Sequence, residues 1–373
     1  MNTSQYWFST AGGGDLGDEI TNSLRFHNST TVLHRTQVAT TINDDKNFTF
    51  ATWFKLGFIG EQNIFVFANQ NPENWILRWT TANNTFGTRH VTGGIANWDT
   101  TPDHTDNVGW YHLLVQCTNG ALDLYVNGAK VGSQIAASLH SSGFDRPFVI
   151  GAENTNGGSS MQGYLADTYF IQGAQLHPIN DGFVRINDDG VLVPDTPTIS
   201  SYGDNGFHLD YADASNPGND VSGENHHFTA VGFDTASISA SNESNDTGHV
   251  DTPTLLYPQY NRVAMSSSQT TSQANLQTSA SSYTWAPATI AIPADCGKKF
   301  YWEVTIRNNA GNETLGMVDP TQRVGQAPAH GWVFCPPLNN IESDQGNIST
   351  VVDTGATSIN TGNGTTYMFA YDA

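Results

Sequence analysis

The sequence has few basic residues, few cysteines and no long apolar run, and each shortage excludes a class of protein. Lysine and arginine number 14 against 35 aspartates and glutamates, which gives a formal net charge of −21. Such a chain repels a phosphate backbone, so we expect no binding to nucleic acid. No stretch is long and apolar enough to span a membrane, so we also expect no membrane insertion.

The N-terminus and the cysteines restrict the class further. The first residues, MNTSQYWFSTAGGGD, lack a basic segment followed by an apolar run, so we expect no signal peptide. The three cysteines, Cys117, Cys296 and Cys335, are odd in number and have no CxxC spacing, which argues against a disulfide framework and a zinc site. Cys117 lies within a strand pattern, and we expect it to be a small core residue.

Helical periodicity is also missing. We find no sustained apolar spacing of three and four residues and no heptads, so long helices and a coiled-coil stalk are not expected. What the chain has instead is 36 glycines and many short apolar segments bounded by turn residues. This pattern predicts an all-β protein built from short antiparallel strands.

Two stretches carry the strongest strand signals. Residues 48–56, FTFATWFKL, alternate with a period of two, which predicts a strand with one buried face. Residues 109–132 contain Asn119-Gly120 and Asn127-Gly128, two pairs that readily take the positive φ angles of tight hairpin turns. The second stretch therefore predicts a three-stranded meander. About nine strands fall within some 150 residues, the density of a two-sheet sandwich.

The order of these motifs resembles a known family. FTFATWFKL, then GWYHLLVQC with LDLYVNGAKVG, then GYLADTYFIQ is similar to the laminin G-like, concanavalin A-like jelly-roll family over residues 20–180. The resemblance implies a jelly roll. It implies a function only loosely, because lectins, adhesion modules and glucanases share this fold.

The later part of the chain carries two further resemblances. The tripeptide DTP occurs at Asp195 and again at Asp251, and the segment between is similar to a linker found behind jelly rolls in tail and appendage proteins of bacterial viruses. Downstream, KKFYWEVTI followed by LGMVD resembles the SPRY family, a β-sandwich used for protein recognition. The glycine turn and aromatic hairpin of that family are missing after TTYMFAYDA. The second sandwich is therefore expected to be incomplete, through truncation, a frameshift or completion by a partner.

These observations predict an all-β chain in four parts: an antiparallel β-sandwich of the jelly-roll type, a β linker, a second, incomplete β-sandwich, and a short arm before them. The arm either docks its aromatic residues on a partner or packs on its own domain. The boundaries we expect are 1–20 for the arm, 21–190 for the jelly roll, 191–254 for the linker and 255–373 for the SPRY-like part.

Catalytic motifs are absent from the sequence. Hydrolysis of a glycan needs two carboxylates placed across the scissile bond, and jelly-roll glucanases supply them as Glu-x-Asp-x-x-Glu, a spacing that does not occur here. No Gly-x-Ser-x-Gly elbow supports a nucleophilic serine either. We therefore expect a protein that is not an enzyme, and a depolymerase is the weakest hypothesis.

The best candidate binding residues lie in the polar stretch 92–108. Trp98 is flanked there by Asn97, Asp99 and His104. An exposed indole stacks on the apolar face of a sugar, while amides and carboxylates bind its hydroxyls. The alternative is that Trp98 plugs the end of its own sandwich.

The same stretch is the best candidate for a metal site. Asp99, Asp103 and Asp106 lie within eight residues, and calcium prefers oxygen ligands from such loops. The alternative is a solvated acidic loop. We expect no other cofactor.

The sequence thus favours a non-catalytic structural or receptor-binding appendage protein of a bacteriophage virion, such as a tail-fibre, tail-associated or head-fibre subunit. It would be assembled in the host cytoplasm, with other virion proteins and host-surface glycans as partners. A homo-oligomer is expected, with a trimer favoured. The alternative is a carbohydrate-binding or adhesion module of a cellular extracellular protein.

Overall fold

The structure is a computed structural model of the 373-residue chain, which forms two compact units. Unit 1 comprises Met1–Gln259 and Thr271–Gln277, and unit 2 comprises Tyr260–Thr270 and Thr278–Ala373. The structure describes residues 15, 17–27, 30–38, 47–57, 60–67, 75–80, 85–90, 94–96, 109–135, 147–158, 160–234, 247, 251–254, 258–261, 265, 269–272, 275–280, 286–289, 299–306, 315–318, 331–335, 340–343 and 365–372.

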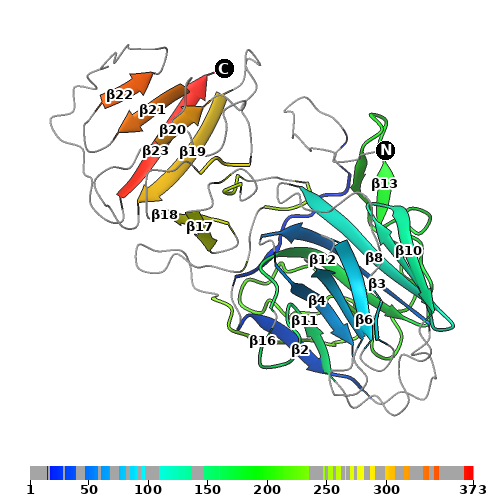
Figure 1. The fold of residues 1–373 in the computed structure, drawn as a ribbon. Coiled ribbons are helices and arrows are strands. Elements are labelled where there is room, and N and C mark those ends of the chain that lie inside the picture. The colour runs from blue at the N-terminus through cyan, green and yellow to red at the C-terminus, as the bar shows by residue number, and fades with distance from the viewer. Residues whose placement is uncertain are drawn as a thin grey trace. The chain divides into compact units, whose positions relative to one another are not determined.

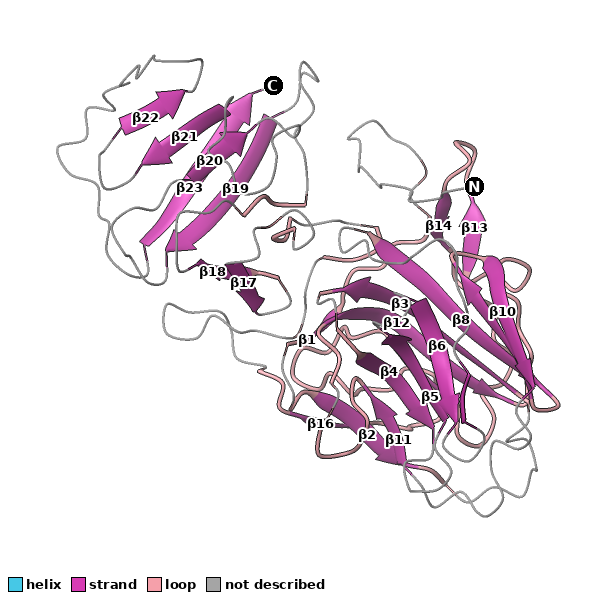
Figure 2. Ribbon diagram, in the orientation of Figure 1, coloured by secondary structure: helices cyan, strands magenta, loops and turns pink. Residues whose placement is uncertain are grey.

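Strands and loops make up all of these described residues, as Figure 2 shows. The expected all-β, antiparallel fold class is confirmed. Within the same residues, no helix is long and apolar enough to cross a membrane.

Unit 1 is a sandwich of two antiparallel sheets (Figure 1). Sheet one has the order β1 (Leu24–Phe26), β12 (Gly163–Gln172), β3 (Phe48–Leu56), β8 (Trp110–Thr118), β9 (Ala121–Val126) and β10 (Ala129–Ile135), with β15 (Phe207–Leu209) also paired to β12. Sheet two has the order β16 (Thr229–Val231), β2 (Val32–Thr36), β11 (Pro147–Ile150), β4 (Gln62–Phe67), β5 (Trp75–Thr80), β6 (Thr85–His90) and β7 (Gly94–Ala96).

The predicted meander is confirmed as β8, β9 and β10. Asn119 and Gly120 have φ angles of 52° and 84°, and Asn127 and Gly128 have 50° and 76°. Both tight turns therefore use the left-handed conformation that Asn-Gly pairs supply. Thr118 pairs with Ala121 and Val126 with Ala129 across these turns.

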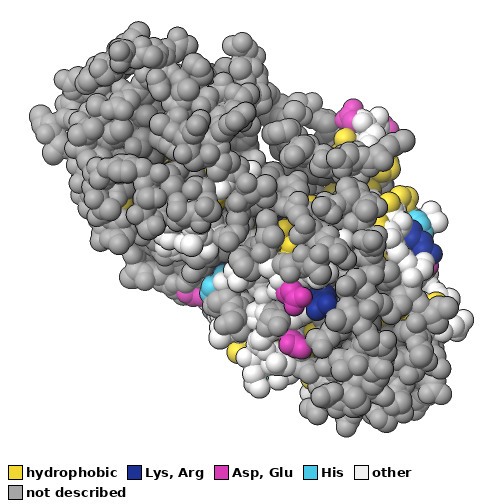
Figure 3. All heavy atoms as spheres, in the orientation of Figure 1, with side chains coloured by type: hydrophobic (Ala, Val, Ile, Leu, Met, Phe, Trp, Pro, Cys, Tyr) yellow, Lys and Arg dark blue, Asp and Glu magenta, His cyan; other side chains and the backbone are white. Residues whose placement is uncertain are grey.

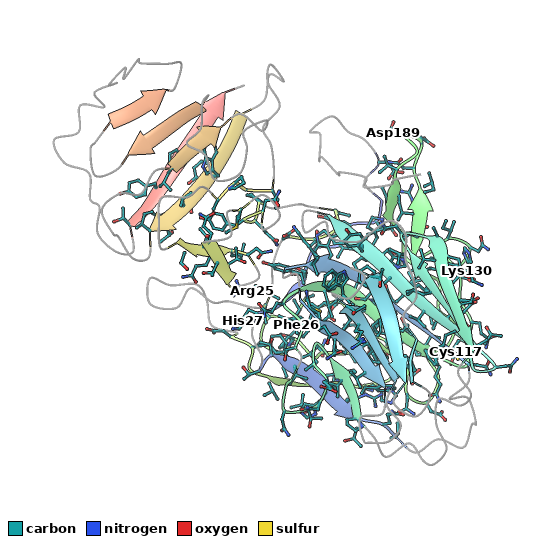
Figure 4. All side chains as sticks on the ribbon, viewed as in Figure 1. Arg25, Phe26, His27, Cys117, Lys130 and Asp189 are labelled. Carbon is teal, nitrogen blue, oxygen red and sulfur yellow. The ribbon has the colours of Figure 1, made fainter. Side chains whose placement is uncertain are left out.

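Aromatic rings from both sheets fill the space between them. Phe50 of β3 stacks on Phe65 of β4 with 4.3 Å between ring centroids. Cys117 is fully buried in this core, as expected, and Trp79 is fully buried as well. Figure 4 shows the dense packing of side chains in this region, with Phe26 and Cys117 labelled. Burial of these apolar side chains away from water holds the two sheets together.

The prediction of one buried face for β3 is wrong, because all nine of its residues are buried. A second apolar layer, on the side away from sheet two, packs Trp53 against Val184 and Leu192. Those two residues belong to β13 (Val184–Ile186) and β14 (Leu192–Pro194), a hairpin that follows the jelly-roll strands in the chain. The alternating pattern missed this cover because polar residues on that face find partners within the fold.

Residues 191–234, within the segment expected to be a β-rich linker, contribute strands to the sandwich. Strand β15 pairs with β12, and β16 pairs with β2. Phe207 and Phe228 from this segment join the core and contact each other at 4.7 Å between ring centroids. The segment therefore closes one edge of both sheets. The predicted boundaries themselves stay a prediction.

The described residues just before β1 pack on their own unit. The amide of Asp18 donates to the carbonyl of Pro194 at 3.0 Å, and Arg185 of β13 donates to Asp15 at 2.6 Å. Residues 1–14, which hold the aromatic patch of the predicted arm, lie outside the described residues.

Unit 2 contains two small sheets in its described part, and residues 269–272 and 277–280 form a further two-stranded sheet. The stacked rings of Trp302 and Phe369, 5.2 Å apart, join two of its strands. Its resemblance to the SPRY family stays a prediction. The strands are β19 (Lys299–Ile306) paired with β23 (Thr365–Asp372), β20 (Leu315–Val318) with β21 (Gly331–Cys335) and β22 (Asn340–Ser343), and β17 (Gln269–Ser272) with β18 (Gln277–Ala280).

Alanine substitutions at two glycines distinguish the free-energy cost of a left-handed backbone from the additional cost of a steric clash. Gly151 and Gly190 have similar φ angles of +85° and +78°, but a Cβ at Gly151 would lie 2.2 Å from the Phe26 ring, whereas one at Gly190 meets nothing within 4 Å. We expect Gly190→Ala to lower the free energy of unfolding by about 1 kcal/mol. We expect Gly151→Ala to lower it by about 1–3 kcal/mol more, because the ring must move. Urea denaturation measures both, and equal losses would contradict this packing.

Candidate functional site

The residues predicted to bind a ligand lie outside the described residues. Asn97, Trp98, Asp99 and His104, and the calcium candidates Asp99, Asp103 and Asp106, all fall within 97–108. The chain enters this stretch from β7 at the edge of sheet two and leaves it into β8, between β3 and β9 in sheet one. The stretch therefore connects the two sheets, and the roles of its residues stay predictions.

A bulge in β12 produces the most concentrated polar cluster of the described residues. Ala166 pairs with Trp53 and Tyr169 with Ala51, so two residues of β12, Asp167 and Thr168, face one residue of β3. Asp167 has a φ of 50° in the left-handed region. Bulges redirect side chains in this way and recur beside functional sites.

The bulge sends its two side chains to different partners. The Thr168 hydroxyl lies 2.7 Å from the Thr52 hydroxyl and 2.8 Å from that of Tyr211. The Asp167 carboxylate instead accepts from the Tyr169 hydroxyl at 3.0 Å and from Nε2 of His208 at 2.6 Å. The His208 ring stacks on Tyr169 with 4.0 Å between centroids. Thus β15 is joined to β12 by side chains as well as by backbone pairing.

The charge of this carboxylate acts on the hydroxyls of two tyrosines. Burial, and next the charge of Asp167, raise the pKa of the Tyr169 hydroxyl. Burial also raises the pKa of Tyr202 to about 12, with Asp167 and Asp220 adding to the effect. Both phenols therefore stay neutral and act as hydrogen-bonding groups over the physiological pH range.

Asp220 organises the loop that follows β15. Its carboxylate accepts from the amides of His208, Ser222 and His226 and from the Ser222 hydroxyl. Burial by itself would raise the pKa of Asp220, but these four hydrogen bonds outweigh it and the pKa lies below its ordinary value. The neighbouring His227 accepts from the Asp220 amide at 3.0 Å. The adjacent histidines 226 and 227 thus have structural partners.

These carboxylates are engaged by donors from the protein itself. Both oxygens of Asp167 and both of Asp220 already accept hydrogen bonds. Within the described ranges, no group of three His, Cys, Asp or Glu residues is arranged to hold a metal ion. The cluster is therefore built to attach residues 202–228 to the sandwich.

A second polar cluster lies on the covered face of sheet one. Nζ of Lys55 lies 2.7 Å from Oδ2 of Asp251, and the exposed fractions of the two side chains are 0% and 6%. Nε1 of Trp110 donates to Oδ1 of Asp251 at 3.3 Å, and Nε2 of Gln259 donates to Oδ2 at 2.9 Å. The Ser23 hydroxyl donates to the Asp251 carbonyl at 2.7 Å. The side chain of Asp251 thus links its own segment to β3 and β8, and its backbone carbonyl adds a bond to Ser23.

Sequence reasoning missed both clusters, although faint signals were present. Asp167 is the last residue of the Gly-x-Leu-x-Asp motif at the start of β12, and Asp251 opens the second DTP tripeptide. Their partners, His208 and Lys55, are 41 and 196 positions away along the chain. Nothing local in the sequence pairs residues at such separations.

Charged side chains are sparse on the described surface. Figure 3 shows acidic and basic side chains scattered among the described atoms of the face it draws, without a broad patch of either sign. One exposed pair is Lys130 of β10 with Asp123 of β9, whose Nζ and Oδ2 are 2.8 Å apart. Figure 4 labels Lys130 on β10. Exposed pairs of this kind contribute little to stability.

His112 is a buried titratable residue in the layer between sheet one and its cover. Its ring meets Trp53 edge to face at 5.2 Å, and burial lowers the pKa of the imidazole to about 3. Its Nδ1 has no hydrogen-bond partner among the residues that the structure describes. The folded protein therefore holds His112 neutral.

A protein-family model matches part of the sandwich. Residues 27–175 match the laminin G model described as the concanavalin A-like lectin/glucanases superfamily. The matched residues run from the end of β1 to just beyond β12. This part of the chain is therefore similar to the laminin G-like, concanavalin A-like superfamily and has a jelly-roll fold consistent with it.

Several solved structures are similar to the chain. The heptameric SAP-like pentraxin of Limulus polyphemus is 17% identical, with 52% of this chain and 94% of the pentraxin covered and a TM-score of 0.38. Domains LG4-5 of the mouse laminin alpha1 chain are 12% identical, with 47% of each chain covered and a TM-score of 0.33. Domain 4 of an extracellular arabinanase from Geobacillus stearothermophilus, in complex with arabinotriose, is 15% identical, with 35% and 63% covered and a TM-score of 0.29. No curated protein matches the chain.

The lowered pKa of His112 predicts a loss of stability in acid. Between about pH 6.5 and pH 3 the unfolded state takes up a proton that the folded state does not, so stability falls as the pH falls through this window. We expect His112→Leu to remove a contribution of about 1.4 kcal/mol per pH unit below pH 6. Urea denaturation of both proteins from pH 4 to pH 8 measures the difference. The difference should be constant above pH 7.5, and a difference that stays constant down to pH 4 would refute the assignment.

Proposed function

We propose that unit 1 is a non-catalytic recognition module that binds glycans through the loops at the rim of its sandwich. The observation that carries this proposal is the burial of every residue of β3 within a lectin-type fold. Sheet one is covered on one side by sheet two and on the other by the hairpin β13–β14 with its neighbouring residues. A ligand therefore meets the loops between strands rather than the face of β3.

The stretch 97–108 has the residue types that suit a sugar best. An indole from Trp98 would stack on the apolar face of a pyranose, and the side chains of Asn97, Asp99 and His104 would bind its hydroxyls. Asp99, Asp103 and Asp106 could supply oxygen ligands to a calcium ion. The donor set fits calcium in residue type, and the ion would order the loop and bridge it to sugar hydroxyls.

The absence of a catalytic pair in the sequence supports a binding role. The Glu-x-Asp-x-x-Glu spacing of jelly-roll glucanases does not occur in the chain. In the described part of unit 1, the carboxylates of Asp167 and Asp220 are held by internal hydrogen bonds, which leaves neither poised as a general acid. Recognition needs only the fold and one suitable loop.

We further propose that the chain is an appendage protein of a bacteriophage virion, binding host-surface glycans or other virion proteins as a homo-oligomer. The support is the order of its parts: a lectin-type sandwich, a segment similar to phage appendage linkers, and a second β unit. The alternative, an adhesion module of a cellular extracellular protein, would use the same fold and the same binding residues. The two proposals differ in location, not in the binding site.

Replacement of the loop tryptophan tests the binding site. We expect Trp98→Ala to weaken binding to the preferred saccharide on a glycan array by at least about tenfold, because stacking on the ring is lost. Trp98→Phe keeps an aromatic face and should retain most of the affinity. A chelator added to the wild-type protein reports the calcium contribution separately.

The outcome that contradicts the binding role is specific. If Trp98→Ala binds as tightly as the wild type while its melting temperature falls, the indole is a plug of the sandwich. If the wild type binds no saccharide on the array, the proposal of glycan recognition fails.

Location is tested independently of binding. We expect peptides of this chain in density-purified phage particles analysed by mass spectrometry, in a fixed ratio to the capsid protein. Their presence only in a cellular surface fraction would favour the alternative of an adhesion module. Release of reducing ends from host polysaccharide by the purified chain would instead indicate an enzyme.

A further inference from the structure

The pair of Lys55 and Asp251 is a close and almost fully buried lysine–carboxylate contact. The lysine nitrogen Nζ and the carboxylate oxygen Oδ2 lie 2.7 Å apart, and both side chains are almost completely shielded from water. The neighbouring side chains are aromatic: Trp53, Trp110 and Tyr164 are all buried there. The attraction between opposite charges explains this contact. The same geometry also suits a condensation of the amine with the carboxyl group to form an amide.

We propose that Lys55 and Asp251 form an intramolecular isopeptide bond between Nζ of the lysine and Cγ of the aspartate. This would be a covalent modification made by the chain itself. It is independent of glycan binding and of any location in a virion.

The reaction balances without any outside reagent. Proton transfer from Nζ to Oδ2 converts the ammonium and carboxylate into a neutral amine and a carboxylic acid. The Nζ lone pair then attacks Cγ, a second proton moves from Nζ to Oδ2, and the Cγ–Oδ2 bond breaks as water leaves. The product is one secondary amide and one water molecule, and nothing is oxidised or reduced.

The surrounding side chains suit each stage of this reaction. Nε1 of Trp110 donates to Oδ1, the oxygen that becomes negative when Nζ attacks, so it would stabilise the tetrahedral intermediate. Nε2 of Gln259 donates to Oδ2, the oxygen that leaves. The Ser23 hydroxyl holds the Asp251 backbone through its carbonyl. Fixed groups of this kind give intramolecular reactions very high effective concentrations.

Burial also decides the direction of the reaction. Amide formation from a free acid and amine in water is opposed by the high concentration of water. Here the exposed fractions of the two side chains are 0% and 6%, so the released water has little opportunity to return. Replacement of a buried ion pair by an amide also removes the cost of keeping two charges away from solvent.

The proposed bond would join the centre of sheet one to the segment that leads out of unit 1. Lys55 lies in β3 and Asp251 is 196 positions later, after both strands that close the sandwich edge. A pulling force applied beyond Asp251 would then act on β3 directly. Residues 56–250 would be protected from unravelling by that force.

Mass spectrometry of the full-length chain tests the proposal under denaturing conditions. We expect an intact mass lower by about 18 Da than the sequence requires, the mass of one water. After trypsin digestion, peptide 47–78 should be joined to peptide 186–262, with cleavage blocked at Lys55. Fragmentation should place the junction at Lys55 and Asp251.

A second lysine–aspartate pair in the same sandwich provides the matched control. Nζ of Lys130 lies 2.8 Å from Oδ2 of Asp123, but the two side chains are 47% and 25% exposed. Lys130→Arg should keep the mass deficit, whereas Lys55→Arg should abolish it. Both variants change the calculated mass by the same amount, so their spectra compare directly.

Two results would overturn the inference. One is a wild-type digest in which the peptide ending at Lys55 and the peptide beginning at Leu56 appear free, at the full expected mass. The other is a deficit that maps within a single peptide, as ring closure at an aspartate next to glycine would give. The wild-type digest decides the question even if Lys55→Arg does not fold.

Discussion

The fold of unit 1 depends on covering both faces of its central strand. Strand β3 has nine buried residues, and those facing away from sheet two include Thr49 and Lys55. Buried polar groups need partners, because an unpaired one costs about 1–3 kcal/mol or more. Thr49 bonds to the carbonyl of Ala174 and the amide of Leu176, and Lys55 contacts Asp251. Residues outside the jelly-roll strands, both directly after β12 and as far downstream as Asp251, are therefore required for a satisfied core.

The same constraint leaves the outer face of sheet one unavailable to a ligand at β3. In many sandwiches an open sheet face can hold a ligand, but here the chain occupies that face itself. The polar clusters around Asp167 and Asp220 serve to hold the covering segment, with their oxygens already accepting hydrogen bonds. The proposed binding therefore rests on segments outside the sheets, and the residue types best suited to it are Asn97, Trp98 and Asp99.

Much of the sandwich could be predicted because its signals are local. The Asn119-Gly120 and Asn127-Gly128 turns follow from the positive φ angles that these residues tolerate, and the register of β8, β9 and β10 follows from the turns. For the candidate site, the sequence indicated only which residue types within 97–108 suit a ligand, and not how they are arranged. The one-sided burial expected for β3 was wrong. An alternating pattern shows which residues are polar, but a polar residue with a hydrogen-bond or ionic partner can still be buried.

The sequence by itself determined the all-β class, the hairpin turns and the burial of Cys117, since each depends on neighbours a few residues apart, while the jelly roll was implied by the order of motifs that resemble a known family. Only the tertiary structure decided that β15 and β16 complete the two sheets, that Asp167 meets His208, and that Lys55 meets Asp251. The physical reason is separation along the chain. Pairings across tens to hundreds of residues are selected by which surfaces remain uncovered once the local elements have formed, and no local pattern records that selection.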